Sequence, residues 1–256
     1  MHHQHRNKLY SLFSQTQQSI IFLEGAKVMY RYQTDYEFAF RQESNFWYVS
    51  GVNEPDCAAI LDIDLKEFHL FVPKRDTQYA VWHGYVNSLN QFRTEYAPDH
   101  VHYIDELSEV VKKLQPSMVF CIDPSSEKQF RSHEPEIPTN TEALIEAMTD
   151  ARVIKTENEL VCLRKASQVN DEAYGQVIRH WKPGMYEYQA KAIFTEVQMS
   201  HGLQQDAYNG IYASGPNSAI LHYVSNTRKT QDGELFLIDA GFESVSYTHL
   251  TLPTKA

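Results

Sequence analysis

Cysteine is scarce in this chain of 256 residues, which has only Cys57, Cys121 and Cys162. The three are widely spaced and form no CxxC pair, so the sequence offers neither a disulfide framework nor a motif built on paired thiols. This usage is typical of the reducing cytoplasm, where thiols act as small core residues. We therefore expect a cytoplasmic protein.

Positive charge and long apolar runs are also lacking. Lysine and arginine number 23 against 33 acidic residues, which gives a net charge of -10 with neutral histidines. An acidic chain has no general attraction to phosphate backbones or anionic lipid, so we expect no nucleic-acid partner and no membrane partner. No apolar run approaches a membrane span, and the start, MHHQHRNKLYSLF, lacks the apolar core of a signal peptide. We expect HHQH to be a solvated terminus rather than a metal site.

The first half of the chain instead alternates short apolar runs with a helical segment. The runs are rich in β-branched and aromatic residues and are bounded by Gly, Pro, Asp or Asn, which predicts strands. They occupy residues 19–23, 45–52, 57–63, 68–73, 101–104 and 118–123. Residues 105–114, DELSEVVKKL, have helical spacing and lie between two of these runs. This order indicates an α/β domain, which we place at residues 1–150.

A second domain is expected at residues 151–243, after the Pro- and Ser/Thr-rich stretch SHEPEIPTNTEA. Thr156 and Glu159 form a capping box that begins a helix, and Lys182-Pro183-Gly184 ends it. A second helix is predicted from Glu187 to about Ser200. The strand-like segments YNGIYASG, AILHY and ELFLIDAG follow, which suggests an α+β domain.

The segment FLIDAG is the sharpest candidate for a functional site. Residues 235–238 are an unbroken apolar run, which predicts a strand buried on both faces, with Asp239 at its end. A carboxylate in that place is costly unless it is paired, hydrogen-bonded or bound to a metal. The alternative is a turn aspartate satisfied by backbone N–H groups.

Two further features carry candidate residues. His222 lies between Leu221 and Tyr223 in a predicted short strand, where a histidine is more often structural than catalytic. The aromatic residues of FRQESNFWYVSGVNEPD suggest a core or a subunit interface, and Trp82 in YAVWHGY could likewise belong to the core.

Six segments, taken together, resemble one family. They are FRQESNFWYVSGVNEPD, FVPKRDTQYAVWHG, RVIKTENELVCLRKAS, KPGMYEY, YNGIYASGPNSAILHY and DGELFLIDAGFE. Their order is similar to that in Xaa-Pro dipeptidases (prolidases) and in aminopeptidase P, over about residues 30–243. The resemblance implies an α/β N-terminal domain of the creatinase/aminopeptidase P type, followed by the start of a pita-bread metallopeptidase domain.

The resemblance also implies a site. In the family two divalent cations, commonly Mn²⁺, share a bridging water or hydroxide and are held by two Asp, one His and two Glu. By position Asp239 matches the first metal-ligating aspartate, and His222 matches a catalytic histidine near the substrate that is not a metal ligand. Tyr208 and Trp82 match substrate-binding residues, the tryptophan often reaching the site from the partner of a homodimer. The implied substrate is an Xaa-Pro dipeptide or short peptide.

The sequence departs from the family after Glu243. The second aspartate would fall at or next to Leu250, and no Asp or Glu follows Glu243. A transposon-type library adapter used in DNA sequencing encodes VSYTHLTLPT, residues 245–254. We therefore expect residues 244–256 to be an adapter-derived tail on a truncated fragment. Such a chain would hold one metal ligand of five, stably bind no metal pair and be inactive as it stands.

The leading interpretation is an Xaa-Pro dipeptidase, and aminopeptidase P is the nearest alternative. A dipeptidase cleaves dipeptides only, whereas aminopeptidase P also releases the first residue of longer peptides. A catalytically dead pita-bread module that binds peptides and a metal-free hydrolase of the creatinase type stay open. Retention of Asp239 argues against both.

Overall fold

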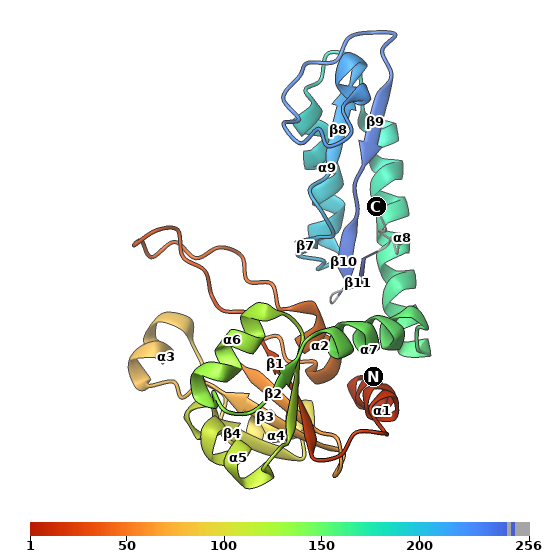
Figure 1. Ribbon diagram of the computed structural model, residues 1–256. Coiled ribbons are helices and arrows are strands. Elements are labelled where there is room, and N and C mark those ends of the chain that lie inside the picture. Colours follow the sequence, from red (N-terminus) through yellow and green to blue (C-terminus); the bar gives the residue numbers. More distant parts are fainter. Residues whose placement is uncertain (245–246, 249–256) are drawn as a thin grey trace. The chain divides into compact units, whose positions relative to one another are not determined.

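The structure, a computed structural model, describes residues 1–244 and 247–248. The chain divides into two compact units, Met1–Ile154 and Lys155–Ala256 (Figure 1). Within the described ranges, no helix combines the length and the apolar character needed to cross a bilayer.

The first unit is built on a mixed sheet of six strands in the order β4-β3-β2-β1-β5-β6 (Figure 1). The antiparallel pairs are β1 with β2 and β2 with β3, and the other neighbours are parallel. The strands are β1 (Ser19–Glu24), β2 (Ala58–Asp62), β3 (Glu67–Val72), β4 (His100–Tyr103), β5 (Met118–Cys121) and β6 (Thr139–Asn140). Strands were predicted at five of these places, and the structure confirms them.

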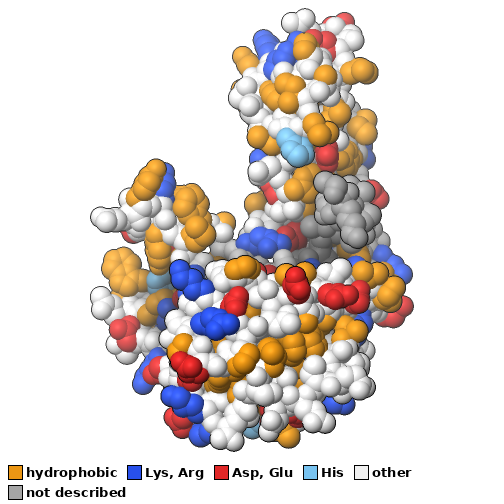
Figure 2. Space-filling model, viewed as in Figure 1, with side chains coloured by type: hydrophobic (Ala, Val, Ile, Leu, Met, Phe, Trp, Pro, Cys, Tyr) orange, Lys and Arg blue, Asp and Glu red, His pale blue; other side chains and the backbone are white. Residues whose placement is uncertain are grey.

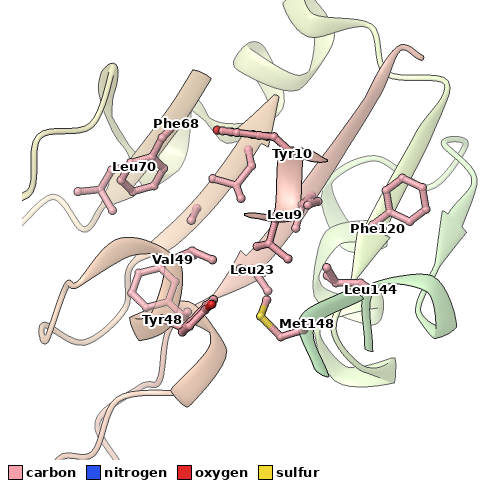
Figure 3. Close-up of a cluster of buried hydrophobic side chains, with 14 of the residues drawn as sticks. Leu9, Tyr10, Leu23, Tyr48, Val49, Phe68, Leu70, Phe120, Leu144 and Met148 are labelled. Atoms are coloured by element: carbon pink, nitrogen blue, oxygen red, sulfur yellow. The ribbon is translucent and has the colours of Figure 1, made fainter. Parts of the chain in front are cut away.

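Helices cover both faces of this sheet, which makes three layers and confirms the α/β class. One core packs the sheet against α1 (His2–Leu12), α2 (Ser44–Ser50), α4 (Leu89–Tyr96) and α7 (Glu142–Val153) (Figure 3). The other packs it against α5 (Leu107–Leu114) and α6 (Pro124–His133). A 3-10 turn, Ile104–Glu106, precedes α5, and α3 (Thr77–His83) contributes no buried residue.

The prediction of a strand at residues 45–52 is wrong, because this segment is the helix α2. The Glu43 carboxylate accepts a hydrogen bond of 2.6 Å from the Phe46 backbone N–H and caps the helix. Gly51 ends it in the left-handed region at φ 75°. Phe46, Trp47 and Tyr48 are all buried, as the expectation of an aromatic core required. Caps at both ends and burial on several sides outweigh the β propensity of aromatic residues.

The expectation of a solvated N-terminus is also wrong, because α1 is docked on the first unit. The Nδ1 atoms of His2 and His5 lie 3.0 and 2.8 Å from the Tyr48 carbonyl oxygen. Arg6 donates a hydrogen bond of 2.8 Å to the Val49 carbonyl. These side chains satisfy carbonyls at the C-terminal end of α2 that the helix leaves without internal partners.

Leu9 of α1 is fully buried in the core of the first unit, so Leu9→Ala should destabilise that unit by about 3 kcal/mol, through lost apolar burial and a residual cavity. Urea unfolding followed by Trp47 fluorescence, with Trp82 and Trp181 replaced by Phe, measures this. Gln4→Ala, at an exposed position of the same helix, is the control and should change little. Equal stability of the two variants would mean that α1 is not docked in solution.

The second unit packs two long helices against short strands. They are α8 (Glu157–His180) and α9 (Glu187–Ser200). The predicted capping box at Thr156 and Glu159 is confirmed, as are the bounds of α9. A two-stranded antiparallel sheet joins β8 (Ile211–Ser214) to β9 (Phe236–Asp239), and a second sheet joins β7 (Gln205–Asp206), β10 (Phe242–Ser244) and β11 (Tyr247–Thr248).

The prediction that residues 235–238 are buried on both faces is wrong. Phe236 and Ile238 pack against the core of the unit, with the Phe236 ring stacked on Trp181 at 4.2 Å. Leu235 is 81% exposed, and Leu237 is exposed as well. Within the described residues, side chains therefore cover only the face of β9 that carries Phe236 and Ile238, and no layer packs over the opposite face.

The tail expected at residues 244–256 falls mostly outside the described residues. Ser244 pairs with Tyr247 in the β10–β11 ladder. Residues 245–246 and 249–256 are not described.

Candidate active site

The structure brings together two of the four predicted site residues, Tyr208 and Asp239. Asp239 is exposed at the end of β9, where its backbone pairs with Ile211 of β8. The Tyr208 hydroxyl donates a hydrogen bond of 2.6 Å to Asp239 Oδ1. Among the described residues no hydrogen bond reaches the other oxygen, Oδ2. The carboxylate is thus held by one oxygen and can offer the other to a cation.

The Tyr208 hydroxyl keeps its proton in this contact. Burial raises the pKa of Tyr208, and the hydrogen bond to the Asp239 carboxylate raises it further, because an ionised phenol would face a second negative charge. The contact is therefore a hydrogen bond from a neutral phenol to a carboxylate oxygen. It orients the carboxylate without neutralising it.

Tyr174 of α8 fixes the backbone next to Asp239 and was missed in the sequence. Its hydroxyl donates to the Ala240 carbonyl at 3.2 Å and accepts from the Ala240 N–H at 3.3 Å. Its ring meets Phe194 edge to face at 5.3 Å. One feature of the sequence could have indicated Tyr174: it lies next to Ala173, on the buried face of a long helix. A tyrosine in such a place needs a hydrogen-bond partner for its hydroxyl.

The predicted short strand around His222 is wrong, because the segment forms a 3-10 helix, η2 (Gly215–Ala219), and then a turn. Gly215 adopts φ +50°, and Pro216 occupies the first turn of η2. These residues favour a turn over a strand, since proline lacks the N–H that a ladder requires. His222 lies in the turn and is exposed, so it is accessible to a substrate without belonging to the Tyr208–Asp239 contact.

A buried carboxylate, Glu187 at the start of α9, holds the segments on both sides of His222. Its Oε1 accepts from the Ser214 N–H and hydroxyl, both at 2.7 Å, and from Asn217 Nδ2 at 3.2 Å. Its Oε2 accepts from the Tyr223 hydroxyl at 2.7 Å and from the Arg228 N–H at 2.9 Å. Glu187 is thus a positioning residue for the His222 turn. The sequence analysis did not predict this role, although Glu187 lies in the segment KPGMYEY.

The hydrogen bonds to Glu187 outweigh the cost of its burial. Burial acts to raise the pKa of this carboxyl, but the bonds from Tyr223, Ser214 and the Arg228 backbone together lower it below its ordinary value. Nearby, the Arg228 guanidinium donates two hydrogen bonds, of 2.6 and 2.5 Å, to the Glu234 carboxylate. The turn is therefore tied to α9 and to the hairpin that leads into β9.

Trp82 lies in the first unit, on α3, and is 77% exposed. The idea that it belongs to the core is therefore wrong. Val81 and Tyr85 beside it are also exposed. A large aromatic side chain in water is available for contact with another molecule.

The described residues do not by themselves form a two-metal site around Asp239. Within residues 1–244, His, Cys, Asp and Glu side chains converge closely enough for a metal only at Glu67, His69 and His100, which lie in the first unit. Asp239 supplies one hard oxygen ligand, which suits Mn²⁺ or a similar ion. A dinuclear centre needs further ligands.

Comparison with known families gives the class of protein. The aminopeptidase P N-terminal domain matches residues 2–120, and metallopeptidase family M24 matches residues 161–251. The chain is a member of the M24 metallopeptidases and carries an N-terminal domain of the aminopeptidase P type.

Individual relatives agree with this class. The chain is 35% identical over 237 residues to an Xaa-Pro dipeptidase of Homo sapiens, which covers 88% of this chain and 48% of the relative. A probable Xaa-Pro aminopeptidase of Penicillium rubens is 34% identical over 230 residues, covering 88% and 45%. The chain therefore spans about half the length of the curated relatives it matches. The fold is similar to that of proline aminopeptidase P II from Yersinia pestis, with TM-score 0.87 and 26% identity over 97% of this chain and 61% of that one.

Proposed function

We propose that this chain belongs to an enzyme that hydrolyses Xaa-Pro peptide bonds, and specifically to an Xaa-Pro dipeptidase. The observation that supports this most is the exposed carboxylate of Asp239, oriented by the Tyr208 hydroxyl at 2.6 Å at the end of β9 in an M24 domain. The identity to Xaa-Pro dipeptidases adds to it.

In this proposal the complete enzyme binds two divalent metal ions, Mn²⁺ being the expected species. When bound, such a pair lowers the pKa of a shared water and polarises the scissile carbonyl. This chain would contribute Asp239 as one ligand, Tyr208 as its orienting donor, and His222 and Trp82 as groups that contact the substrate. The described residues do not complete this centre.

Aminopeptidase P is the second candidate. It is favoured by the similarity of the fold to aminopeptidase P structures, among them a zinc-substituted Escherichia coli enzyme described as a complex with product, at TM-score 0.83. The two candidates share chemistry and differ in the length of peptide they accept.

We further infer a homodimer in the cytoplasm. Large apolar side chains are exposed on the loop between β1 and α2, which projects at the left of Figures 1 and 2. They are Met29, Tyr30, Tyr32, Tyr36 and Phe38. Such a patch on one unit is typical of a surface that another protein covers. The three cysteines are free thiols, in keeping with a reducing compartment.

The test begins by resequencing the source locus through the codon of Glu243 and beyond. The full reading frame is then expressed and assayed with Mn²⁺ against an Xaa-Pro dipeptide and an Xaa-Pro-Yaa tripeptide. Cleavage of the dipeptide alone supports the dipeptidase, and release of the first residue from the tripeptide supports aminopeptidase P. A protein that binds the peptides but cleaves neither would contradict the proposal and favour a binding module.

A further inference from the structure

A cluster of histidines with one glutamate lies on the first unit, at the edge of its sheet. Glu67 and His69 stand two residues apart on β3 and so share a face. In the parallel β3–β4 ladder His69 pairs with His100, while His102 of β4 pairs with Phe71. Four side chains that commonly bind metals are thus aligned along β3 and the four-residue edge strand β4.

Three of these side chains converge on one point. His100 Nε2 lies 3.2 Å from Glu67 Oε2, and His69 Nε2 lies 3.9 Å from the same oxygen. Ligand atoms of all three residues lie within 4.8 Å of one another. Ligands at tetrahedral zinc stand about 3.3 Å apart, which follows from zinc–nitrogen bonds of about 2.0 Å. Small side-chain rotations would bring this set to that spacing.

His69 is the anomalous member, since it is only 5% exposed and its Nε2 atom has no hydrogen-bond partner. A buried polar atom without a partner is rare and costly. The 3.9 Å to the Glu67 oxygen is too long for a hydrogen bond. A cation between His69 and Glu67 would satisfy both the nitrogen and the carboxylate.

The other ring nitrogen of His69 has the partner that metal-ligating histidines usually have. His69 Nδ1 lies 3.2 Å from His102 Nε2, so one of the two donates to the other. With the proton on His69 Nδ1, the unprotonated Nε2 atom lies 3.9 Å from the Glu67 carboxylate oxygen, and a cation bound between the two would make that arrangement favourable.

We propose that Glu67, His69 and His100 form a mononuclear site for a divalent transition metal of the zinc type, with His102 supporting His69 from behind. Two imidazoles and one carboxylate are a donor set that zinc accepts, with water as a fourth ligand. The His100 side chain is 45% exposed, which gives the ion access from solvent. Bound metal would cross-link β4 to β3 and stabilise the edge of the sheet. The site is independent of Asp239 and of the proposed peptidase activity.

The test titrates the whole chain, freed of metal by a chelator, with Zn²⁺ in a calorimeter. We expect one tight site and a rise in Tm of the first unit with Zn²⁺. His100→Ala and Glu67→Gln should each weaken binding at least about tenfold and abolish the rise in Tm. These two positions are chosen because their side chains are partly exposed, so the variants should fold.

Three control variants separate this site from other candidates. His3→Ala tests the HHQH stretch, His201→Ala tests an exposed His–Glu pair with Glu172 at 2.9 Å, and Asp239→Asn tests the peptidase ligand. All three should bind Zn²⁺ as the unaltered chain does. Zinc binding that survives both His100→Ala and Glu67→Gln, or no binding by the unaltered chain, would overturn the proposal.

Discussion

Replacing Glu187 by alanine should unfold most of the second unit at room temperature. The substitution leaves the backbone N–H groups of Ser214 and Arg228 and the hydroxyl of Tyr223 without their acceptor. Removing one member of a buried charged network costs about 4 kcal/mol, which is a large part of the stability of a domain of this size. The loss also removes a negative charge from the N-terminus of α9, where the helix dipole favours one.

Trp181 gives a local measurement of this loss. Its ring stacks on Phe236 inside the second unit, and it becomes the sole reporter when Trp47 and Trp82 are replaced by Phe. Glu196→Ala, at an exposed site on the same helix, is the matched control and should shift the urea midpoint little. Equal midpoints for the two variants would show that the carboxylate does not organise this unit.

Glu187→Gln is a sharper form of the same test. Each oxygen of Glu187 accepts from a backbone N–H, Ser214 on one side and Arg228 on the other. The glutamine amide would have to direct its NH₂ group at one of these two N–H groups. Two donors would then face each other, because a backbone N–H cannot act as an acceptor. Glutamine should therefore destabilise the unit despite its equal size, by about 2 kcal/mol.

The pH dependence of this difference follows from the lowered pKa of Glu187. The carboxyl binds a proton more readily in the unfolded chain, near its ordinary value of 4.5, than in the folded unit. Its contribution is therefore complete above that value and disappears as the pH falls through the lower folded pKa. The gap in stability between the unaltered chain and Glu187→Gln should be constant from pH 7 to about pH 5 and shrink below pH 4.5.

Local signals in the sequence were enough to predict much of the fold. The capping box at Thr156 and Glu159 places the start of α8 because both partners lie within one turn. The helix α2 was missed because its determinants are a glutamate cap before it, Gly51 after it and burial by distant segments. The exposed face of β9 could not be predicted either, since an apolar run does not say whether another layer will pack over each face of the strand.

Prediction of the site residues from the sequence is limited in the same way, to those with local signals. Asp239 could be proposed because a carboxylate directly after an apolar run is unusual within a short window. Tyr174 and Glu187 could not, because their partners lie 66 residues away at Ala240 and 27 to 41 residues away at Ser214, Asn217, Tyr223 and Arg228. Pairs so far apart leave no periodicity in the chain. His69 was overlooked for a related reason, since its neighbours come from another strand.

Asp239→Asn in the complete enzyme should lower kcat/KM on the order of 10³-fold. Asparagine keeps the shape and can still accept the hydrogen bond from Tyr208, but its neutral oxygen is a far weaker ligand for a divalent ion. Metal catalysis supplies several kcal/mol of transition-state stabilisation, and about 4 kcal/mol corresponds to that fold-change. Because Asp239 is exposed, the unfolding free energy should change little, so metal content and activity fall while the fold stays.

Tyr208→Phe distinguishes a metal ligand from a turn aspartate. Phenylalanine removes the donor at 2.6 Å but leaves the carboxylate, so metal affinity and activity should drop about tenfold, far less than for Asp239→Asn. Asp232→Asn, an exposed aspartate in the same hairpin, should leave both unchanged. If Asp239 served only to accept backbone hydrogen bonds in a turn, Asp239→Asn would behave like Asp232→Asn. If Asp239 is a metal ligand oriented by Tyr208, the loss of metal affinity and activity should be absent in Asp232→Asn, moderate in Tyr208→Phe and largest in Asp239→Asn.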